Sequence, residues 1–265
     1  MKIISLVENT TKSGLQTRHG LSLYIKTRTH TILFDLGPDN TLFENAKKRD
    51  IDLSKVDIVV ISHGHIDHGG ALQRFLKINS SARIYVQKSA FVPHYSKFLL
   101  FKVPIGIDEC LKDNRQIILL EGNHKIDDEL FLFTISNTTV LTSPLNNVLY
   151  DKYGKDIFKH EQNLIISEKK TVLIMGCGHN GIINITNEAN KYNPSLCIGG
   201  FHLMNPITRR MVSTNYLNKL VTMLQEFNNI KFYTCHCTGL KAFYYLSRRI
   251  NNIHYLSCGD EMIIE

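Results

Sequence analysis

The run from His63 to Gly70 (HGHIDHGG) constrains this chain more than any other stretch of its sequence. It places three imidazoles and one carboxylate within six residues, directly after an apolar segment that is predicted to be a buried strand. Imidazole and carboxylate groups suit zinc and related divalent ions, and a loop at a strand end can turn them toward one point. Gly64, Gly69 and Gly70 permit the tight backbone path. The pattern predicts a metal centre, and the alternative is a surface loop with Asp67 as a helix cap.

The HxHxDH arrangement after an apolar strand resembles the signature of the metallo-β-lactamase superfamily. The resemblance implies the α/β class and an αββα four-layer sandwich with the metal ions at one edge. It also implies an aspartate at the end of an earlier strand, which orients the metal loop through hydrogen bonds and does not bind metal. Asp35, in residues 31–37 (TILFDLG), stands at that position. The alternative for Asp35 is an ordinary turn-initiating residue before Gly-Pro.

Further ligands must come from the second half of the chain, since a metal site needs about three or four protein donors per ion. As in the later motifs of the superfamily, three histidines each follow an apolar strand and precede a helix, namely His179, His202 and His236. We expect two ions, with His63, His65 and His179 on one and with Asp67, His68 and His236 on the other. For each of the later histidines, the alternative is a partly buried side chain with ordinary hydrogen-bond partners.

The second half of the chain departs from the superfamily pattern at one position. Most relatives carry an aspartate there that bridges both metals, but residues 180 to 235 contain no Asp. The residue after the predicted strand at that place is Cys177. It is either a soft metal ligand or a buried small side chain, and we favour burial. The spacing of the metals and the occupancy of the second site stay open at this point.

Several segments together resemble one branch of the superfamily, the metallo-hydrolases named for dihydropterin ribofuranosylaminobenzene phosphate synthase. They are Glu8-Asn9-Thr10, residues 19–23, residues 62–70, Glu161-Gln162 and the motifs GCGHNGIIN, GGFHL and HCTG. The similarity extends over nearly the whole chain. It implies that Asn9 and His19 contribute to the substrate pocket. It also adds a synthase-type enzyme of pterin metabolism to the functions to be considered.

A dinuclear centre of this kind predicts a hydrolase in which a metal-activated water attacks a small anionic, phosphate-bearing substrate. Zn²⁺ is the expected ion, with Mn²⁺ or Fe²⁺ as alternatives. Asp67 is expected to hold and orient the water, and His202 to act on the substrate, with a further metal ligand as the alternative for His202. Thr238 and Gly239 stand where the last predicted helix begins. Free amides at a helix N-terminus suit a phosphate, although plain capping is the commoner role.

The bulk composition limits the partners of the chain. It has 265 residues, a formal net charge of +7 and a sequence pI near 9.0, but its Lys and Arg residues form no dense run. We therefore expect a small anionic molecule and not a nucleic acid as the partner. The six cysteines form no CxxC pair, which favours reduced thiols and a cytoplasmic protein. No apolar stretch reaches membrane-spanning length, and the sequence does not indicate an oligomeric state.

The order of predicted elements favours one domain over residues 1–265, with residues 90–115 interpreted as a flap or insertion over a pocket. β-Branched and aromatic runs predict strands at 2–7, 21–26, 31–36, 56–62, 83–87, 116–120, 129–135, 163–167, 171–175, 196–199, 230–235 and 261–264. Helical spacing predicts helices at 69–78, 181–192, 212–227 and 239–249. Two strand groups that each end in alternating strands and helices predict two sheets sandwiched between helices.

Three other functions on the same fold are weighed against a hydrolase. Redox di-iron relatives carry Glu where His65 stands, which counts against that function. A nuclease would need clustered basic residues in a nucleic-acid clamp, and the sequence shows no such cluster. A non-catalytic sensor that binds a ligand without turnover stays an alternative, although the complete ligand set favours an enzyme.

Overall fold

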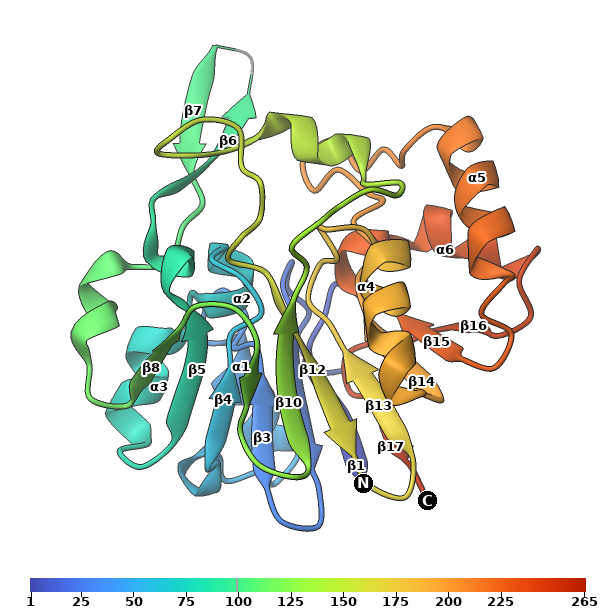
Figure 1. Cartoon of the computed structure of the whole chain (residues 1–265). Coiled ribbons are helices and arrows are strands. Elements are labelled where there is room, and N and C mark those ends of the chain that lie inside the picture. Colours follow the sequence, from blue (N-terminus) through green and yellow to red (C-terminus); the bar gives the residue numbers. More distant parts are fainter. Residues whose placement is uncertain (99) are drawn as a thin grey trace.

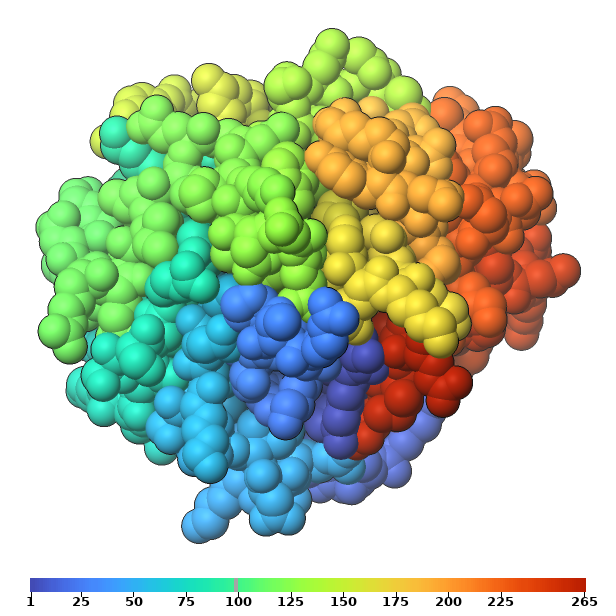
Figure 2. Space-filling view, turned by 60° about the horizontal axis from the view of Figure 1, so that its bottom comes forward, coloured from blue at the N-terminus to red at the C-terminus, as the bar shows by residue number. Residues whose placement is uncertain are grey.

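The computed structural model describes residues 1–98 and 100–265. Two seven-stranded sheets lie face to face, and helices cover the outer face of each (Figure 1). This is the αββα arrangement of the α/β class that the sequence predicts. The first and last strands are neighbours in one sheet, so the blue N-terminal and red C-terminal segments meet on the surface (Figure 2).

The first sheet contains most of the strands of the N-terminal half, in the order β17-β1-β2-β3-β4-β5-β8. Strands β3, β4, β5 and β8 run parallel, so their carboxyl ends lie at one edge of the sheet. The strands of this sheet are β1 (Lys2–Val7), β2 (Ser22–Lys26), β3 (Thr31–Phe34), β4 (Ile58–Val60), β5 (Arg83–Gln87), β8 (Ile117–Leu120) and β17 (Glu261–Ile263).

The second sheet has the order β16-β15-β14-β13-β12-β10-β9, and its strands β13, β14, β15 and β16 are parallel. In open α/β sheets, ligands bind outside the carboxyl ends of such parallel strands. The strands of this sheet are β9 (His124–Lys125), β10 (Leu130–Thr134), β12 (Gln162–Ser167), β13 (Thr171–Ile174), β14 (Leu196–Gly199), β15 (Lys231–Thr234) and β16 (Ile253–Tyr255).

Helices α1 and α3 pack on the outer face of the first sheet, and α4, α5 and α6 pack on the second. The α-helices are α1 (Thr41–Lys48), α2 (Ile66–Gly69), α3 (Leu72–Ile78), α4 (Ile182–Ala189), α5 (Thr214–Leu224) and α6 (Leu240–Ser247). The 3₁₀ helices are η1 (Leu53–Lys55), η2 (Lys88–Phe91), η3 (Glu109–Asp113), η4 (Pro144–Val148), η5 (Asn190–Tyr192) and η6 (His236–Thr238). In the described part of the chain, no helix has the length and apolarity needed to cross a membrane.

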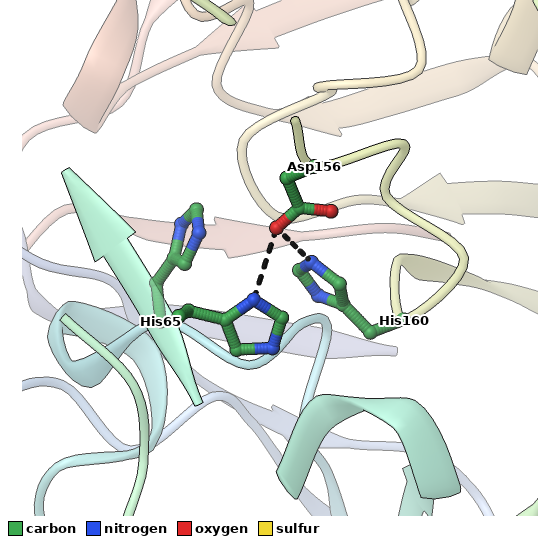
Figure 3. Close-up of side chains that lie close together, drawn as sticks. His65, Asp156 and His160 are labelled. Atoms are coloured by element: carbon green, nitrogen blue, oxygen red, sulfur yellow. Dashed lines mark hydrogen bonds and ion pairs between the residues drawn. The ribbon is translucent and has the colours of Figure 1, made fainter. Parts of the chain in front are cut away.

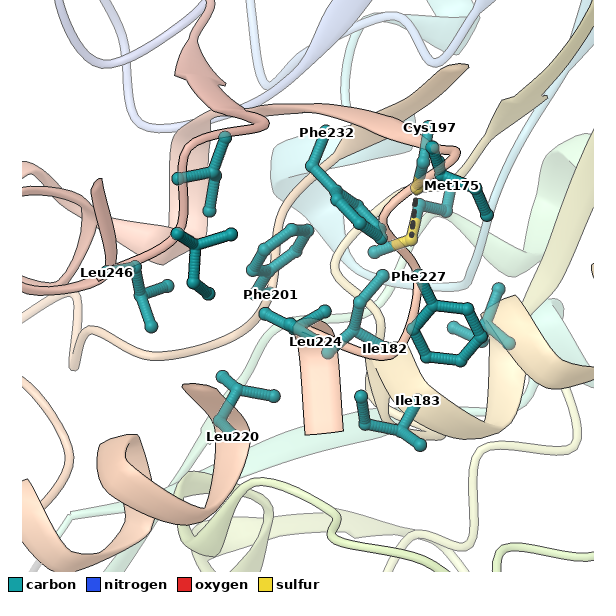
Figure 4. Packing of buried hydrophobic residues seen from close by; sticks show 14 of the residues in the cluster. Met175, Ile182, Ile183, Cys197, Phe201, Leu220, Leu224, Phe227, Phe232 and Leu246 are labelled. Carbon is teal, nitrogen blue, oxygen red and sulfur yellow. Dashed lines mark hydrogen bonds between the residues drawn. The ribbon is translucent and has the colours of Figure 1, made fainter. Parts of the chain in front are cut away.

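Three buried layers hold the sandwich together, one between the sheets and one under each helical layer. Ile25 and Leu164 belong to the layer between the sheets, whereas Phe201 and Phe232 pack with Leu224 of α5 in the outer layer of the second sheet (Figure 4). Because both faces of the central strands are covered, their sequences are continuous apolar runs and do not alternate with polar residues. Such runs can be recognised in the sequence without knowledge of the fold, which explains why these strands were predicted.

The structure confirms the predicted strands, with ends that shift by one or a few residues. The predicted strand 56–62 is shorter, because only residues 58–60 pair in β4. The predicted helix 69–78 is α3, which begins at Leu72, and the short helix α2 before it was not predicted. Helix α1 was not predicted, since it has only eight residues and two of its four buried positions, Thr41 and Asn45, are polar.

Within residues 90–115, of which residue 99 lies outside the described part, the structure has two paired strands and a 3₁₀ helix where the sequence predicts no regular element. Strand β6 (His94–Phe98) lies between β7 (Phe101–Pro104) and β11 (Leu149–Asp151) and pairs with both in a small third sheet. The hairpin projects beyond the edge of the two large sheets (Figure 1). Its interpretation as a flap stays a prediction.

We predict that Phe232→Ala lowers the free energy of unfolding by about 3–5 kcal/mol, the usual result of removing a large buried aromatic ring. Phe232 is fully buried, with its ring centroid 6.1 Å from that of Phe201. Urea unfolding followed by circular dichroism measures the change. Tyr244→Ala is the control, because Tyr244 is exposed. A loss below about 1 kcal/mol for Phe232→Ala would contradict the assigned core.

Candidate metal centre

The carboxylate of Asp35 connects the end of β3 to the loop after β4. Its Oδ1 accepts a hydrogen bond from the Ser62 amide at 2.7 Å, and its Oδ2 accepts one from the Ser62 hydroxyl at 2.7 Å. The same Oδ2 lies 2.6 Å from Nδ1 of His68. Asp35 is fully buried, so these donors replace the water that the carboxylate loses. Asp35 therefore orients the loop of residues 62–68, as the sequence indicates.

Three imidazoles converge at the carboxyl ends of β4 and β13. One ring nitrogen from each of His63, His65 and His179 lies within 4.8 Å of the other two. Protein partners hold the Nδ1 atoms of two of them: the Ser62 hydroxyl lies 2.8 Å from His63, and Oδ1 of Asn146 lies 3.1 Å from His179. The Nε2 atoms of His63 and His179 are buried and have no hydrogen-bond partner within the described part of the chain. Such atoms are rare in protein interiors, and here they fit a shared cation.

A second group of donors adjoins the first. Nε2 of His68 lies 3.2 Å from Nε2 of His236, and Oδ2 of Asp67 lies 3.2 Å from the same atom of His236. Since Nδ1 of His68 donates to Asp35 and Nδ1 of His236 donates to Oδ1 of Asn9, two lone pairs would face each other unless a proton or a cation lies between them. The arrangement therefore fits a second cation.

The charges around the two groups agree with metal binding. Burial and the neighbouring imidazoles hold the pKa values of His63, His65 and His179 well below their usual range, so these rings are neutral and can bind a cation. Burial also lowers the affinity of His68 for a proton, but the carboxylates of Asp35 and Asp67 outweigh it and raise its pKa to about 9. A proton can therefore take the place of the second cation.

Cys177 lies among the donors of both groups. The side chain is buried, as we expected, and its Sγ lies 3.2 Å from Nε2 of His68. One donor atom from each of Cys177, His236 and Cys237 lies within 4.8 Å of the others. Burial and ligation are therefore compatible at this position, where the sequence analysis treated them as alternatives.

A cavity of about 410 Å³ opens over these donors. His202 lines it, with both ring nitrogens buried and without a partner, and its ring centroid lies 4.2 Å from that of His179. His19 also lines it, and its Nε2 lies 3.4 Å from Oδ2 of Asp67. Burial and the nearby His236 lower the pKa of His19 to about 4. His19 therefore presents a neutral imidazole to a ligand in the cavity.

A sequence model of the metallo-beta-lactamase superfamily matches residues 15–159, more than half of the chain. The chain belongs to the metallo-beta-lactamase superfamily. Members of this superfamily are generally metal-dependent hydrolases. The predicted membership is confirmed.

Individual members of the superfamily resemble the chain over nearly its full length. An uncharacterized protein of Methanocaldococcus jannaschii is 30% identical over 259 residues, with 96% of each chain covered. Another protein of that organism, named 7,8-dihydropterin-6-methyl-4-(beta-D-ribofuranosyl)-aminobenzene-5'-phosphate synthase, is 28% identical, with 91% of this chain and 89% of that protein covered. The crystal structure of a metal-dependent hydrolase of the beta-lactamase superfamily is 28% identical, with a TM-score of 0.83 and coverage of 100% and 99%. The predicted resemblance to the synthase branch is also confirmed.

Three residues that we predicted to contact the substrate do not line the cavity, namely Asn9, Thr238 and Gly239. Asn9 donates to the carbonyl of His236 at 3.0 Å and accepts from its ring, so it holds a predicted ligand. Thr238 is fully buried, and its hydroxyl accepts a hydrogen bond from the Phe201 amide at 2.9 Å. Gly239 packs against the side chain of Met204. A role of these residues in substrate binding stays a prediction.

Sequence reasoning gave no role to several residues that support the ligands. Asn146 lies in η4, where no motif marks it. Glu8 and Glu161 belong to the segments of the branch resemblance, and their function is visible only in space. Glu8 accepts a hydrogen bond from the His236 amide at 2.7 Å, and Glu161 accepts one from the His179 amide at 2.7 Å. Burial raises the pKa of Glu161 to about 7.

We predict that Asp35→Asn weakens zinc binding about 10- to 100-fold, the usual effect of losing a partner that orients ligands. The amide cannot accept from both Ser62 and His68 as the carboxylate does. Competition with a chromophoric chelator measures the affinity. Asp57→Asn is the control, because Asp57 also contacts a histidine, His30, but away from this site. Equal zinc affinity in Asp35→Asn and the unsubstituted chain would contradict the role of Asp35.

Proposed function

We propose that the chain is a metal-dependent hydrolase that uses a metal-activated water on a small substrate bearing phosphate or another anionic group. The observation that carries this proposal is the convergence of one ring nitrogen each from His63, His65 and His179 beside the cavity, with Nε2 of His63 and Nε2 of His179 buried and unpartnered within the described residues. Because the chain belongs to the superfamily, it belongs to a family of metal-dependent hydrolases.

The donor chemistry supports two divalent ions, with zinc preferred over manganese or iron. We assign His63, His65 and His179 to one ion and Asp67, His68 and His236 to the other. Cys177 supplies a soft sulfur donor beside His68, in the place of the aspartate of most relatives. Imidazole with thiolate favours zinc, whereas manganese prefers oxygen donors. Ions bound there supply Lewis acidity, which lowers the pKa of water and polarises the bond to be cleaved.

We assign the remaining catalytic roles to Asp67 and His202. Asp67 is half-buried and lies at the junction of His19, His68 and His236, and its carboxylate is placed to accept a hydrogen bond from the attacking water and orient it. His202 faces the cavity with both ring nitrogens free of protein partners. It is placed to donate a hydrogen bond to the leaving group or to charge that develops on an oxygen of the substrate. The alternative is that His202 is a metal ligand, because one donor atom each of His202, Cys177 and His179 lies within 4.8 Å of the other two.

The residues that line the cavity support a more specific proposal for the shape and charge of the substrate. Ile66, Ile105, Leu145 and Leu149 give the outer cavity an apolar lining, and Lys97 adds a cationic side chain. We propose that the anionic group of the substrate lies toward the donors and Lys97 and that an apolar body fills the outer part. The net charge of +7 agrees with an anionic substrate.

A second candidate is a synthase-type reaction of pterin metabolism. It is favoured by the 28% identity to the relative named as such a synthase, over 91% of this chain. A non-catalytic sensor is a third candidate, and it would bind metal and ligand without turnover. Incubation of the zinc-loaded protein with the precursors of that synthase, beside generic phosphodiesters, lactones and thioesters, separates the three.

We predict that His179→Ala lowers hydrolysis of the best of these generic substrates at least about 100-fold, because it removes a ligand from the first group. The decrease should be accompanied by loss of one equivalent of zinc in the metal analysis. Spectrophotometric turnover with the zinc-loaded protein is the measurement.

The control for this experiment is His254→Ala, which removes an exposed imidazole from β16 and should leave turnover unchanged. Turnover that persists in His179→Ala with full zinc content would end the hydrolase proposal. Turnover of a pterin precursor, with no hydrolysis of the generic substrates, would favour the synthase.

A further inference from the structure

A second buried cluster of imidazoles lies directly beside the metal loop, and the proposed mechanism does not use it. It consists of His94 on β6, Asp156 and His160, with exposed fractions of 2%, 8% and 2%. One donor atom from each of them, and one from His65, lie within 4.8 Å of one another. Figure 3 shows Asp156 and His160 grouped with His65.

The hydrogen bonds of the cluster fix the protonation of His160. Its Nδ1 accepts from the amide of Gly64 at 3.0 Å, so the proton of the neutral ring must be on Nε2. That Nε2 lies 3.0 Å from Oδ2 of Asp156, which accepts the proton in a hydrogen bond. The carboxylate therefore selects the tautomer of His160 that can hold the Gly64 amide.

Gly64 is the residue between the predicted ligands His63 and His65, and it is held from two sides. Its carbonyl accepts from the amide of Ile107 at 3.0 Å, while its amide donates to His160. A Cβ at this position would lie 2.7 Å from Nε2 of His94 and 2.4 Å from the carbonyl of Ala90. The loop therefore has no room to move toward His94.

His94 extends the cluster to the hairpin. Its Nδ1 lies 2.9 Å from the same Oδ2 of Asp156 and donates to it. The ring of His94 packs edge-on against that of His65, with the two centroids 5.7 Å apart. Asp156 therefore fixes the orientation of a ring that borders a predicted ligand.

We propose that Asp156 is a positioning residue for the metal centre, acting through His160 on the Gly64 amide and through the ring of His94 that packs against His65. This inference rests on the proposed metal centre. A further metal site in the cluster is the competing interpretation. It is disfavoured because a cation on Nε2 of His160 would put the proton on Nδ1, against the N–H of Gly64.

The test compares cobalt and zinc affinity, and the visible spectrum of the cobalt-loaded protein, for the unsubstituted chain and for Asp156→Asn. We expect a 10- to 100-fold loss of affinity, about the size found for partners that orient ligand histidines, together with altered cobalt bands. Asp151→Asn is the matched control. Asp151 precedes Asp156 by five residues, and among the described residues its side chain accepts hydrogen bonds from the backbone amides of Tyr153 and Gly154 and from no side chain.

A second pair of variants keeps the test decisive if Asp156→Asn does not fold. The side-chain oxygen of an asparagine occupies nearly the position of Nδ1 of a histidine, so His160→Asn should still accept from Gly64. We therefore expect His160→Asn to retain most of the affinity that His160→Ala loses. Thermal unfolding of each variant checks the fold.

The outcomes separate this inference from the proposed function. Unchanged affinity and cobalt spectrum in both Asp156→Asn and His160→Ala, with normal binding by the unsubstituted chain, would overturn the positioning role alone. An additional equivalent of metal that is lost in Asp156→Asn would overturn it in favour of a further metal site. A chain that binds no divalent ion would overturn both proposals.

Discussion

A buried imidazole has two ring nitrogens to satisfy, and on four predicted ligands, His63, His68, His179 and His236, a side chain holds Nδ1 and leaves Nε2 facing other donors. The Nδ1 atoms have side-chain partners, whereas the Nε2 atoms lie together. The clearest case is the pair His68 and His236, whose Nε2 atoms are 3.2 Å apart. Each Nδ1 partner fixes a tautomer and the direction of a ring, so the partners determine where a cation can bind. The carboxylate of Asp35 is central among them, because it holds both His68 and the start of the metal loop.

The fold brings these groups together by placing the carboxyl ends of two sets of parallel strands at one edge. Asp35 and the metal loop follow β3 and β4 of the first sheet, whereas Cys177, His202 and His236 follow β13, β14 and β15 of the second. The apolar layer between the sheets keeps the two edges in register. Substitutions in that layer should therefore affect metal binding as well as stability.

Much of this could be predicted from the sequence because the signals are local. The apolar runs of the strands and the density of histidines after β4 need no knowledge of distant contacts, and they led to the correct fold class and superfamily. Asn146, Asp156 and His160 gave no such signal, because a lone Asn, Asp or His in an irregular segment looks like a surface residue. Their partners His179, Gly64 and His94 lie 33, 96 and 62 positions away in the chain. The hairpin of β6 and β7 was missed for a related reason, since β7 is exposed and its apolar residues do not face a core.

The proposed metal centre requires cations that bind between imidazole nitrogens of histidines from both halves of the chain. A crystal structure of the zinc-loaded protein, with anomalous data collected on both sides of the zinc absorption edge, tests this directly. We predict one anomalous peak among His63, His65 and His179 and a second among Asp67, His68 and His236. A zinc-saturated crystal with no peak at the first of these positions would contradict the account.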